Sequence, residues 1–126
     1  EIMQESCYQL YKLLNRPIIF YPVKYDRLLE PVIYDPNKNK DIEKIYKSKE
    51  EKTVAKRVFV NNENAGATTT TLSSARGLYF AIRKNNLVYA VVGIDMSNKK
   101  DFSIQDKSLF LALINEISLA FDSLKK

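Results

Sequence analysis

The residue types that could do chemistry gather in residues 63–82, which read ENAGATTTTLSSARGLYFAI. A phosphate-binding loop needs several glycines and a lysine followed by serine or threonine, whereas the central AGATTTTL has one glycine and no lysine. A threonine nucleophile needs an adjacent base or a free terminal amine, and the neighbouring sequence supplies neither. We therefore predict a connecting loop whose hydroxyls bond backbone groups. Contact with a ligand is the alternative.

Histidine is absent from the chain, and cysteine occurs once, at Cys7. The lack of histidine excludes Ser-His and Cys-His catalysis, histidine-bound metals and a phosphoacceptor histidine within this chain. A single cysteine excludes an internal disulfide and is typical of a reducing compartment. Because Cys7 falls on the apolar face of a predicted helix, we expect a buried, unreactive thiol rather than a redox centre.

The charge of the chain is concentrated between residues 38 and 57. The formal net charge is +5, and this segment holds eight Lys or Arg against four Asp or Glu. Clustered cations can bind nucleic acid by releasing phosphate counterions. Here acids alternate with the bases and no arginine-aromatic pattern accompanies them, so we interpret the segment as a solvated helix face.

Length and composition indicate one soluble globular domain. The chain has 126 residues, of which 45% are hydrophobic and 28% charged. No stretch approaches the roughly 18 apolar residues that would cross a bilayer, and no signal-peptide pattern is present. The chain starts without methionine, already in a helical pattern, which we interpret as a fragment of a longer polypeptide.

The first half of the sequence predicts a helix, a strand pair and a second helix. Apolar residues at three- and four-residue steps predict a helix over residues 1–15. Residues 17–23 and 28–35 are rich in β-forming types and predict a hairpin, with Pro31 indicating an edge position. Residues 41–61 predict a helix. Because its middle is wholly polar, a later start, near Ser48, is the alternative.

The second half predicts a second hairpin. Residues 77–84 and 87–97 are strongly apolar, and only Asn85 and Asn86 separate them, which suits a tight turn. Both faces of the second strand are apolar, so we expect it at the centre of a sheet covered on both sides.

A long helix is predicted to close the chain. Ser103 and Asp106 have the spacing of an N-terminal cap, and apolar residues up to Leu124 form a broad stripe. Leu111 and Leu119 fall outside this stripe and indicate a second packing surface. Hairpins separated by helices, without β-α-β alternation, predict an antiparallel sheet with helices layered on it. PAS, GAF and profilin-like modules share this layout.

Residues 53–126 carry a more specific likeness. The run VAKRVFVNNENAGATTTTLSSARGLYFAI, then VVGI and SIQDKSLFLALINEISLAF, resembles the GAF-like domain of the KdpD potassium/osmolarity sensor histidine kinases. That family writes a helix ending in an aromatic residue and asparagine, then A-G-x-G-T-x-T-L-P and L-Y-x-P-L. The residues that match this pattern are Ala65, Gly66, Thr69, Thr71, Leu72, Ala75, Leu78 and Tyr79.

The resemblance implies that residues 1–126 form a single GAF-like sensor domain of the α+β class. Its central antiparallel sheet of about five to six strands would be flanked by N- and C-terminal helices. The parent would be a histidine kinase anchored in the inner or plasma membrane. The domain would lie in the cytoplasm, catalyse nothing itself and relay a signal to a kinase module downstream in the same chain. The resemblance also implies a homodimer through the terminal helices and a small-molecule or ion effector of unknown identity.

Seven residues are predicted to supply contacts to such an effector, between the sheet and the helices that cover it: Asn61, Gly66, Thr69, Thr71, Arg76, Tyr79 and Asp95. Gly66 is also predicted to adopt a positive φ that ends the preceding helix. No cofactor and no nucleic acid are expected. Two alternatives stay open: a ligand-free module that only dimerises and relays strain, and a basic nucleic-acid-binding domain.

Overall fold

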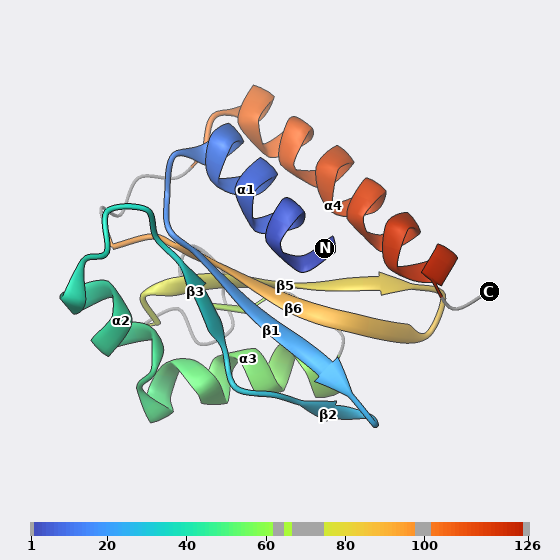
Figure 1. Cartoon of the computed structure of the whole chain (residues 1–126), viewed down its shortest axis with the longest axis horizontal. Helices are drawn as coiled ribbons and strands as arrows, with labels where there is room; N and C mark the ends of the chain where they lie inside the picture. Colours follow the sequence, from blue (N-terminus) through green and yellow to red (C-terminus); the bar gives the residue numbers. More distant parts are fainter. Residues whose placement is uncertain (1, 62–64, 67–74, 98–101, 125–126) are drawn as a thin grey trace.

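The computed structural model describes residues 2–61, 65–66, 75–97 and 102–124, and within this part the chain forms four helices and one six-stranded sheet (Figure 1). In chain order the elements are α1 (Ile2–Leu14), β1 (Ile18–Lys24), β2 (Arg27–Leu28), β3 (Val32–Tyr34), α2 (Lys40–Tyr46), α3 (Lys49–Asn61), β4 (Ala65–Gly66), β5 (Gly77–Lys84), β6 (Leu87–Asp95) and α4 (Ile104–Leu124). None of these helices is long and apolar enough to cross a membrane.

The sheet is antiparallel, with β1 and β6 at its centre. Its order is β2-β1-β6-β5-β4, and β3 pairs with β1 on the same edge as β2. Ile19 of β1 faces Gly93 of β6, and Tyr79 of β5 faces Gly93 from the other side. The centre of the sheet therefore combines strands from both predicted hairpins.

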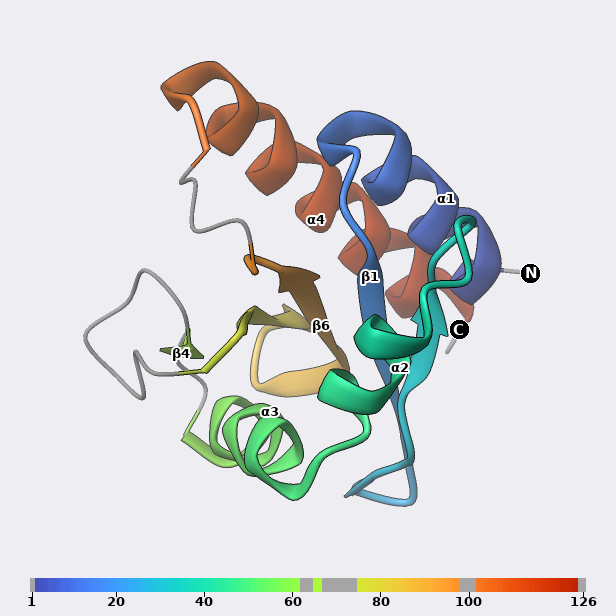
Figure 2. The same cartoon turned by 90° about the vertical axis from the view of Figure 1, so that its left-hand side faces the viewer.

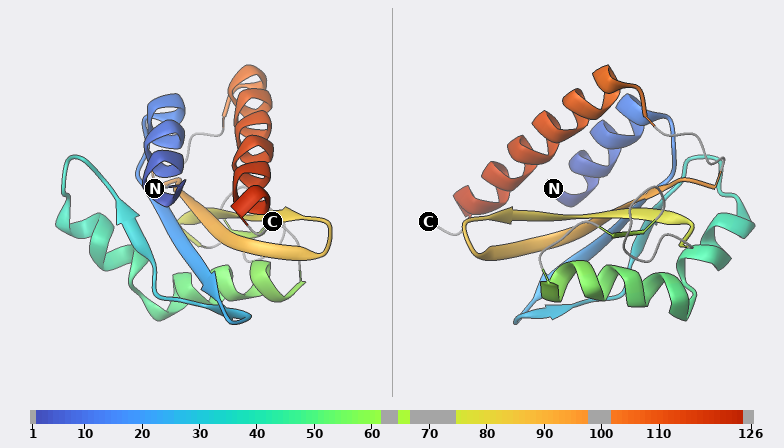
Figure 3. Two further views of the ribbon diagram at one scale, coloured as in Figure 1. Left: turned by 45° about the vertical axis from the view of Figure 1, so that its right-hand side comes forward. Right: turned by 180° about the vertical axis from the view of Figure 1, so that it is seen from behind.

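Helices cover both faces of the sheet. Helices α1 and α4 lie side by side on one face, and α3 lies on the other, with α2 at its N-terminal end (Figures 2 and 3). Alternate residues of each strand supply the two layers, so Phe20 and Val92 pack toward α1 and α4, whereas Tyr21 and Val91 pack toward α3. The predicted α+β class and the doubly covered central strand are confirmed.

Local signals in the sequence set several element ends. Asn15 adopts φ 54° directly after α1, and Asn85 adopts φ 57° in the two-residue turn between β5 and β6. The Ser103 hydroxyl accepts a 3.0 Å hydrogen bond from the backbone N–H of Asp106 and so caps α4 as predicted.

Three predictions of detail are wrong. The strand expected over residues 28–35 is interrupted at Pro31, which has no N–H for a ladder, so β2 and β3 are separate. The single helix expected over residues 41–61 divides into α2 and α3, whereas the alternative start near Ser48 is confirmed, because the Ser48 hydroxyl accepts a 3.4 Å hydrogen bond from Glu51 N at the start of α3. Leu124, expected in the apolar stripe of α4, is 71% exposed.

Candidate functional site

A buried carboxylate, Glu51, lies between α3 and the sheet and is 3% exposed. Its two oxygens accept three hydrogen bonds: from the backbone N–H of Arg76, just before β5, at 2.9 Å, from that of Gly77 at 3.1 Å, and from the Tyr79 hydroxyl at 2.7 Å. A buried carboxylate is stable only when such donors replace water. Glu51 therefore fastens the first turn of α3 to the strand that follows residue 75.

Sequence reasoning missed Glu51 because it treated the KSKEEK segment as a solvated face. The signal was present in the spacing. Glu51 precedes the buried Val54, Ala55 and Val58 by three, four and seven residues, which places it on the same helix face. Its neighbour Glu50 is exposed, so only one acid of the pair lies in the core.

A second polar pair lies beside the first. The hydroxyl of Tyr46, the last residue of α2, donates to Asp95 Oδ1 over 2.5 Å, and the backbone N–H of Ser97 donates to the same oxygen over 3.2 Å. Tyr46 is fully buried, whereas Asp95 ends β6 and is partly exposed. Asp95 thus shapes the turn after β6 and holds α2 against the sheet.

All three glycines of the chain border the ring of Tyr79. A Cβ at Gly93 would lie 2.5 Å from this ring, one at Gly77 would lie 2.9 Å from the rings of both Tyr79 and Tyr46, and one at Gly66 would lie 3.3 Å from the Tyr79 ring. Side chains at these positions would therefore displace Tyr79. Among the described residues, the Tyr79 ring therefore fills the space beside these three glycines.

The three buried tyrosines keep their hydroxyl protons, and two of them, Tyr46 and Tyr79, donate to carboxylates. Burial and the nearby Glu51 carboxylate raise the pKa of Tyr79, and burial together with the hydrogen bond to Asp95 raises the pKa of Tyr46. Burial, Glu51 and Glu30 raise the pKa of Tyr21. These hydroxyls stay neutral near neutral pH, so within the described residues the contacts of Tyr46 and Tyr79 hold α2, α3 and the sheet together and form no acid-base pair.

The predicted effector residues that the structure describes fall into two groups. Arg76 and Tyr79 share Glu51, Gly66 packs against Tyr79, and Asp95 joins the adjoining pair through Tyr46. Asn61 stands apart from these hydrogen bonds as the exposed last residue of α3.

Two further predicted residues, Thr69 and Thr71, lie outside the described residues. The predicted positive φ of Gly66 is confirmed at 107°. However, Gly66 lies in β4, opposite Leu78, and α3 ends at Asn61, so the expected role of Gly66 in ending the helix is wrong.

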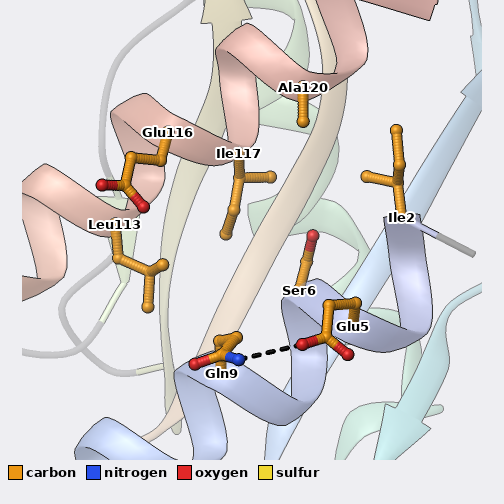
Figure 4. A pocket seen from close by; sticks show the side chains of 8 residues that line it. All are labelled: Ile2, Glu5, Ser6, Gln9, Leu113, Glu116, Ile117 and Ala120. Atoms are coloured by element: carbon orange, nitrogen blue, oxygen red, sulfur yellow. Dashed lines mark hydrogen bonds between the residues drawn. The ribbon is translucent and has the colours of Figure 1, made fainter.

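A groove between α1 and α4 forms a second candidate surface (Figure 4). It encloses about 710 Å³, and its walls are Ile2, Glu5, Ser6 and Gln9 from α1 and Leu113, Glu116, Ile117 and Ala120 from α4. A neighbouring hollow of about 360 Å³ shares Gln9, Leu113 and Glu116 and extends the groove to Lys12 and Leu109. The groove follows the seam between the two helices.

Exposed leucines stand on α4 outside the core. Leu109, Leu111 and Leu119 are 48%, 52% and 45% exposed, as the sequence predicts for Leu111 and Leu119.

Cys7 on α1 is 2% exposed, and burial raises the pKa of its thiol to about 12, so the predicted buried thiol is confirmed. Among the residues that the structure describes, no three His, Cys, Asp or Glu side chains form a group that could hold a metal ion.

Comparison with solved structures identifies the fold. The chain superposes on the GAF domain/HD domain protein from Geobacter sulfurreducens with a TM-score of 0.63, at 12% identity, over 99% of this chain and 93% of that one. It superposes on the GAF3 domain of a Synechocystis protein with a TM-score of 0.60, at 10% identity, over 98% and 93%. The chain has the GAF fold. No protein-family model matches its sequence.

The chain also has a relative in sequence. It is 28% identical over 123 residues to the sensor protein KdpD of Clostridium acetobutylicum. The alignment covers 97% of this chain and 13% of that protein, so the chain spans about one eighth of its relative's length. The predicted resemblance to the KdpD sensor kinases is confirmed.

Proposed function

We propose that residues 1–126 form a non-catalytic sensory domain of a KdpD-like sensor histidine kinase, and that the domain passes its input to a downstream kinase module through α1 and α4. The parent protein would be anchored in the inner or plasma membrane, with this domain in the cytoplasm. The similarity to KdpD, which extends over almost the whole chain, supports this proposal.

The observation that carries the relay is the contact between the first and last described helices. Leu10 of α1 and Phe110 and Ile117 of α4 belong to one apolar cluster over the sheet. A shift of α1 therefore changes the packing of α4, because a close-packed cluster does not deform freely. A segment continuing from α4 would carry that change onward as a population shift.

A second copy of this chain is the partner that we propose for the open side of α1 and α4. Leu111 and Leu119, eight residues apart on α4, share a side of this helix and offer an exposed apolar surface. Lys12 on α1 and Glu116 on α4 line the same groove and would form pairs of opposite charge across a two-fold axis.

The oligomeric state tests this proposal. Sedimentation equilibrium of the purified chain should show a dimer, and Leu111→Glu or Leu119→Glu should raise its dissociation constant by about tenfold or more, because like charges would meet at the interface. Val60→Glu is the matched control, since Val60 is 65% exposed on α3, on the opposite face. A monomer at all concentrations, or an equal effect of the control, would contradict the proposed dimer.

An effector-driven version is the second candidate, favoured by the hydrogen bonds that join Arg76 N and the Tyr79 hydroxyl to Glu51 of α3, and by the neighbouring bond between Asp95 and Tyr46 of α2. An effector that contacts these residues would act on α3 through Glu51. Potassium ions and cyclic nucleotides are the first compounds to screen by thermal shift, because selective binding to the folded state raises the melting temperature. A shift supports effector sensing, and no shift at high concentration supports the ligand-free relay. We expect no salt-dependent binding of a generic oligonucleotide.

A further inference from the structure

A cavity at the edge of the sheet is not used by the proposed relay. It encloses about 410 Å³ between the β1–β2 hairpin and α3. Leu28 and Leu29 form one apolar side, Phe59 and Val60 of α3 form the other, and Tyr21 of β1 contributes to the lining. Its volume falls within the roughly 300–1,000 Å³ typical of small-molecule sites.

Charged side chains surround this apolar interior. Lys52 of α3 forms an ion pair with Glu30 at 2.5 Å, which links the helix to the segment after β2. Arg27 and Lys56 also line the cavity and form no ion pair with any described residue, whereas Asp26 is the remaining acid. Once the Lys52–Glu30 pair is set aside, two cations face one acid, and the lining favours an anion.

Tyr21, one of the lining residues, carries an unsatisfied polar group, its buried hydroxyl. Tyr21 is 1% exposed, and its buried hydroxyl has no hydrogen-bond partner among the described residues. A buried hydroxyl without a partner costs about 1–3 kcal/mol in protein mutational data, so its retention needs an explanation. Burial and the carboxylates of Glu51 and Glu30 raise its pKa, so it is a neutral donor that requires an acceptor.

We propose that this edge cavity binds a small amphipathic anion. The apolar body of the ligand, an aromatic ring or short aliphatic chain, would lie between Leu28 and Phe59. Its phosphate or carboxylate group would meet Arg27 and Lys56, and an acceptor atom would satisfy the Tyr21 hydroxyl. The proposal goes beyond the relay through α1 and α4, because the cavity lies on the opposite face of the sheet.

The test uses NMR titration of the uniformly ¹⁵N-labelled 126-residue chain with four probes. Phenyl phosphate and benzoate combine an aromatic ring with an anionic group, phenol has the ring alone, and inorganic phosphate has the charge alone. Saturable shifts of the amides of residues 26–30 and 52–60 are expected for phenyl phosphate, benzoate or both. Phenol and inorganic phosphate should bind at least about fivefold more weakly, because each lacks one half of the interaction.

Three single substitutions locate the contacts. Lys56→Gln should weaken binding of the anionic aromatic probe about three- to tenfold, because a charge-assisted contact is lost. Lys44→Gln is the matched control: it removes the same charge from an exposed position on α2 that does not line the cavity. Tyr21→Phe should weaken binding about threefold or more while the chain remains folded, because only the unpartnered hydroxyl is lost.

Several outcomes would overturn the proposal. Absence of saturable shifts at 20 mM of either anionic aromatic probe would do so. Equal binding of inorganic phosphate, with shifts spread over all lysines of α2 and α3, would show charge attraction only. If phenol bound as tightly as the anionic probes, the negative charge would not contribute to binding. If Lys44→Gln weakened binding as much as Lys56→Gln, Lys56 would not be the residue that contacts the anion. The proposed relay through α1 and α4 is tested separately, by sedimentation of the chain, so none of these results would count for or against it.

Discussion

Two tyrosines of the same buried layer should respond oppositely to loss of their hydroxyl groups. Tyr79→Phe removes a donor to Glu51, whereas Tyr21→Phe removes a hydroxyl that has no partner among the described residues. Both side chains are buried, at 0% and 1% exposure, and their rings contact each other edge to face at 6.3 Å between centroids. The two substitutions therefore differ in hydrogen bonding and little in apolar burial.

The magnitudes follow from the bonding of each hydroxyl. Tyr79 donates over 2.7 Å to a carboxylate that is itself 3% exposed, and hydrogen bonds to charged groups contribute about 1.5–3 kcal/mol. Tyr79→Phe should lower the free energy of unfolding by about 2–3 kcal/mol, because Glu51 keeps its charge and loses a donor. Tyr21→Phe should be neutral or stabilise by up to about 1 kcal/mol, since a polar group without a partner leaves the core.

Urea denaturation followed by circular dichroism measures both changes, and a thermal melt should show Tyr79→Phe lowered by roughly 5–12 °C. A double-mutant cycle of Tyr79→Phe with Glu51→Gln isolates the pair, and the two losses should be less than additive. Equal destabilisation by the two tyrosine substitutions, or additive losses in the cycle, would refute the assigned role of Glu51.

Three other predictions follow from the same layer and from α1. Burial raises the pKa values of Tyr21, Tyr46 and Tyr79 above those of the unfolded chain, so the free energy of unfolding should be constant below about pH 10 and fall above it. The fall should be about 1.4 kcal/mol per pH unit for each tyrosine that is ionised only in the unfolded state. Urea midpoints from pH 8 to 11 measure this change, and a flat profile would contradict it. Gly93→Ala should lower the free energy of unfolding by at least about 2 kcal/mol, because its methyl group would meet the Tyr79 ring. Adding Tyr79→Leu to the same chain should recover part of that loss in urea denaturation, and no recovery would count against the contact. Cys7 should react with a thiol reagent at pH 8 only after denaturant is added, because its pKa of about 12 leaves almost no thiolate; rapid labelling of the native chain would contradict its burial.

Periodic features of the sequence predicted the antiparallel sheet with helices layered on it, and the resemblance of residues 53–126 to the KdpD sensor kinases then favoured the GAF fold among the modules that share this layout. The three- and four-residue steps in residues 1–15 predict α1, and the turn at Asn85 and Asn86 predicts the hairpin of β5 and β6. The apolar character of both faces of residues 87–97 predicts the central, covered position of β6, because such a strand is stable only between two layers. These signals are local, so they can be recognised without knowing what lies across the core.

The candidate site was less predictable because its contacts join distant parts of the chain. Glu51 is separated from Tyr79 by 28 residues, and no pattern near either residue specifies the other. Tyr79 and Asp95 were proposed as ligand donors, yet in the structure both bind other parts of the chain. The cavity beside Tyr21 depends on the place where the β1–β2 hairpin meets α3, which the sequence does not encode locally.

Disulfide trapping across the α1 and α4 surface tests the central claim most directly. Oxidation of the Leu111→Cys variant at micromolar concentration should give a covalent dimer. Val60→Cys should stay monomeric although Val60 is more exposed than Leu111, at 65% against 52%, because α3 lies on the opposite face of the sheet (Figure 3). The native Cys7 is buried and should not interfere. A covalent dimer from Leu111→Cys alone is the result that we predict; no dimer, or equal trapping through Val60→Cys, would contradict transmission through paired α1 and α4 helices.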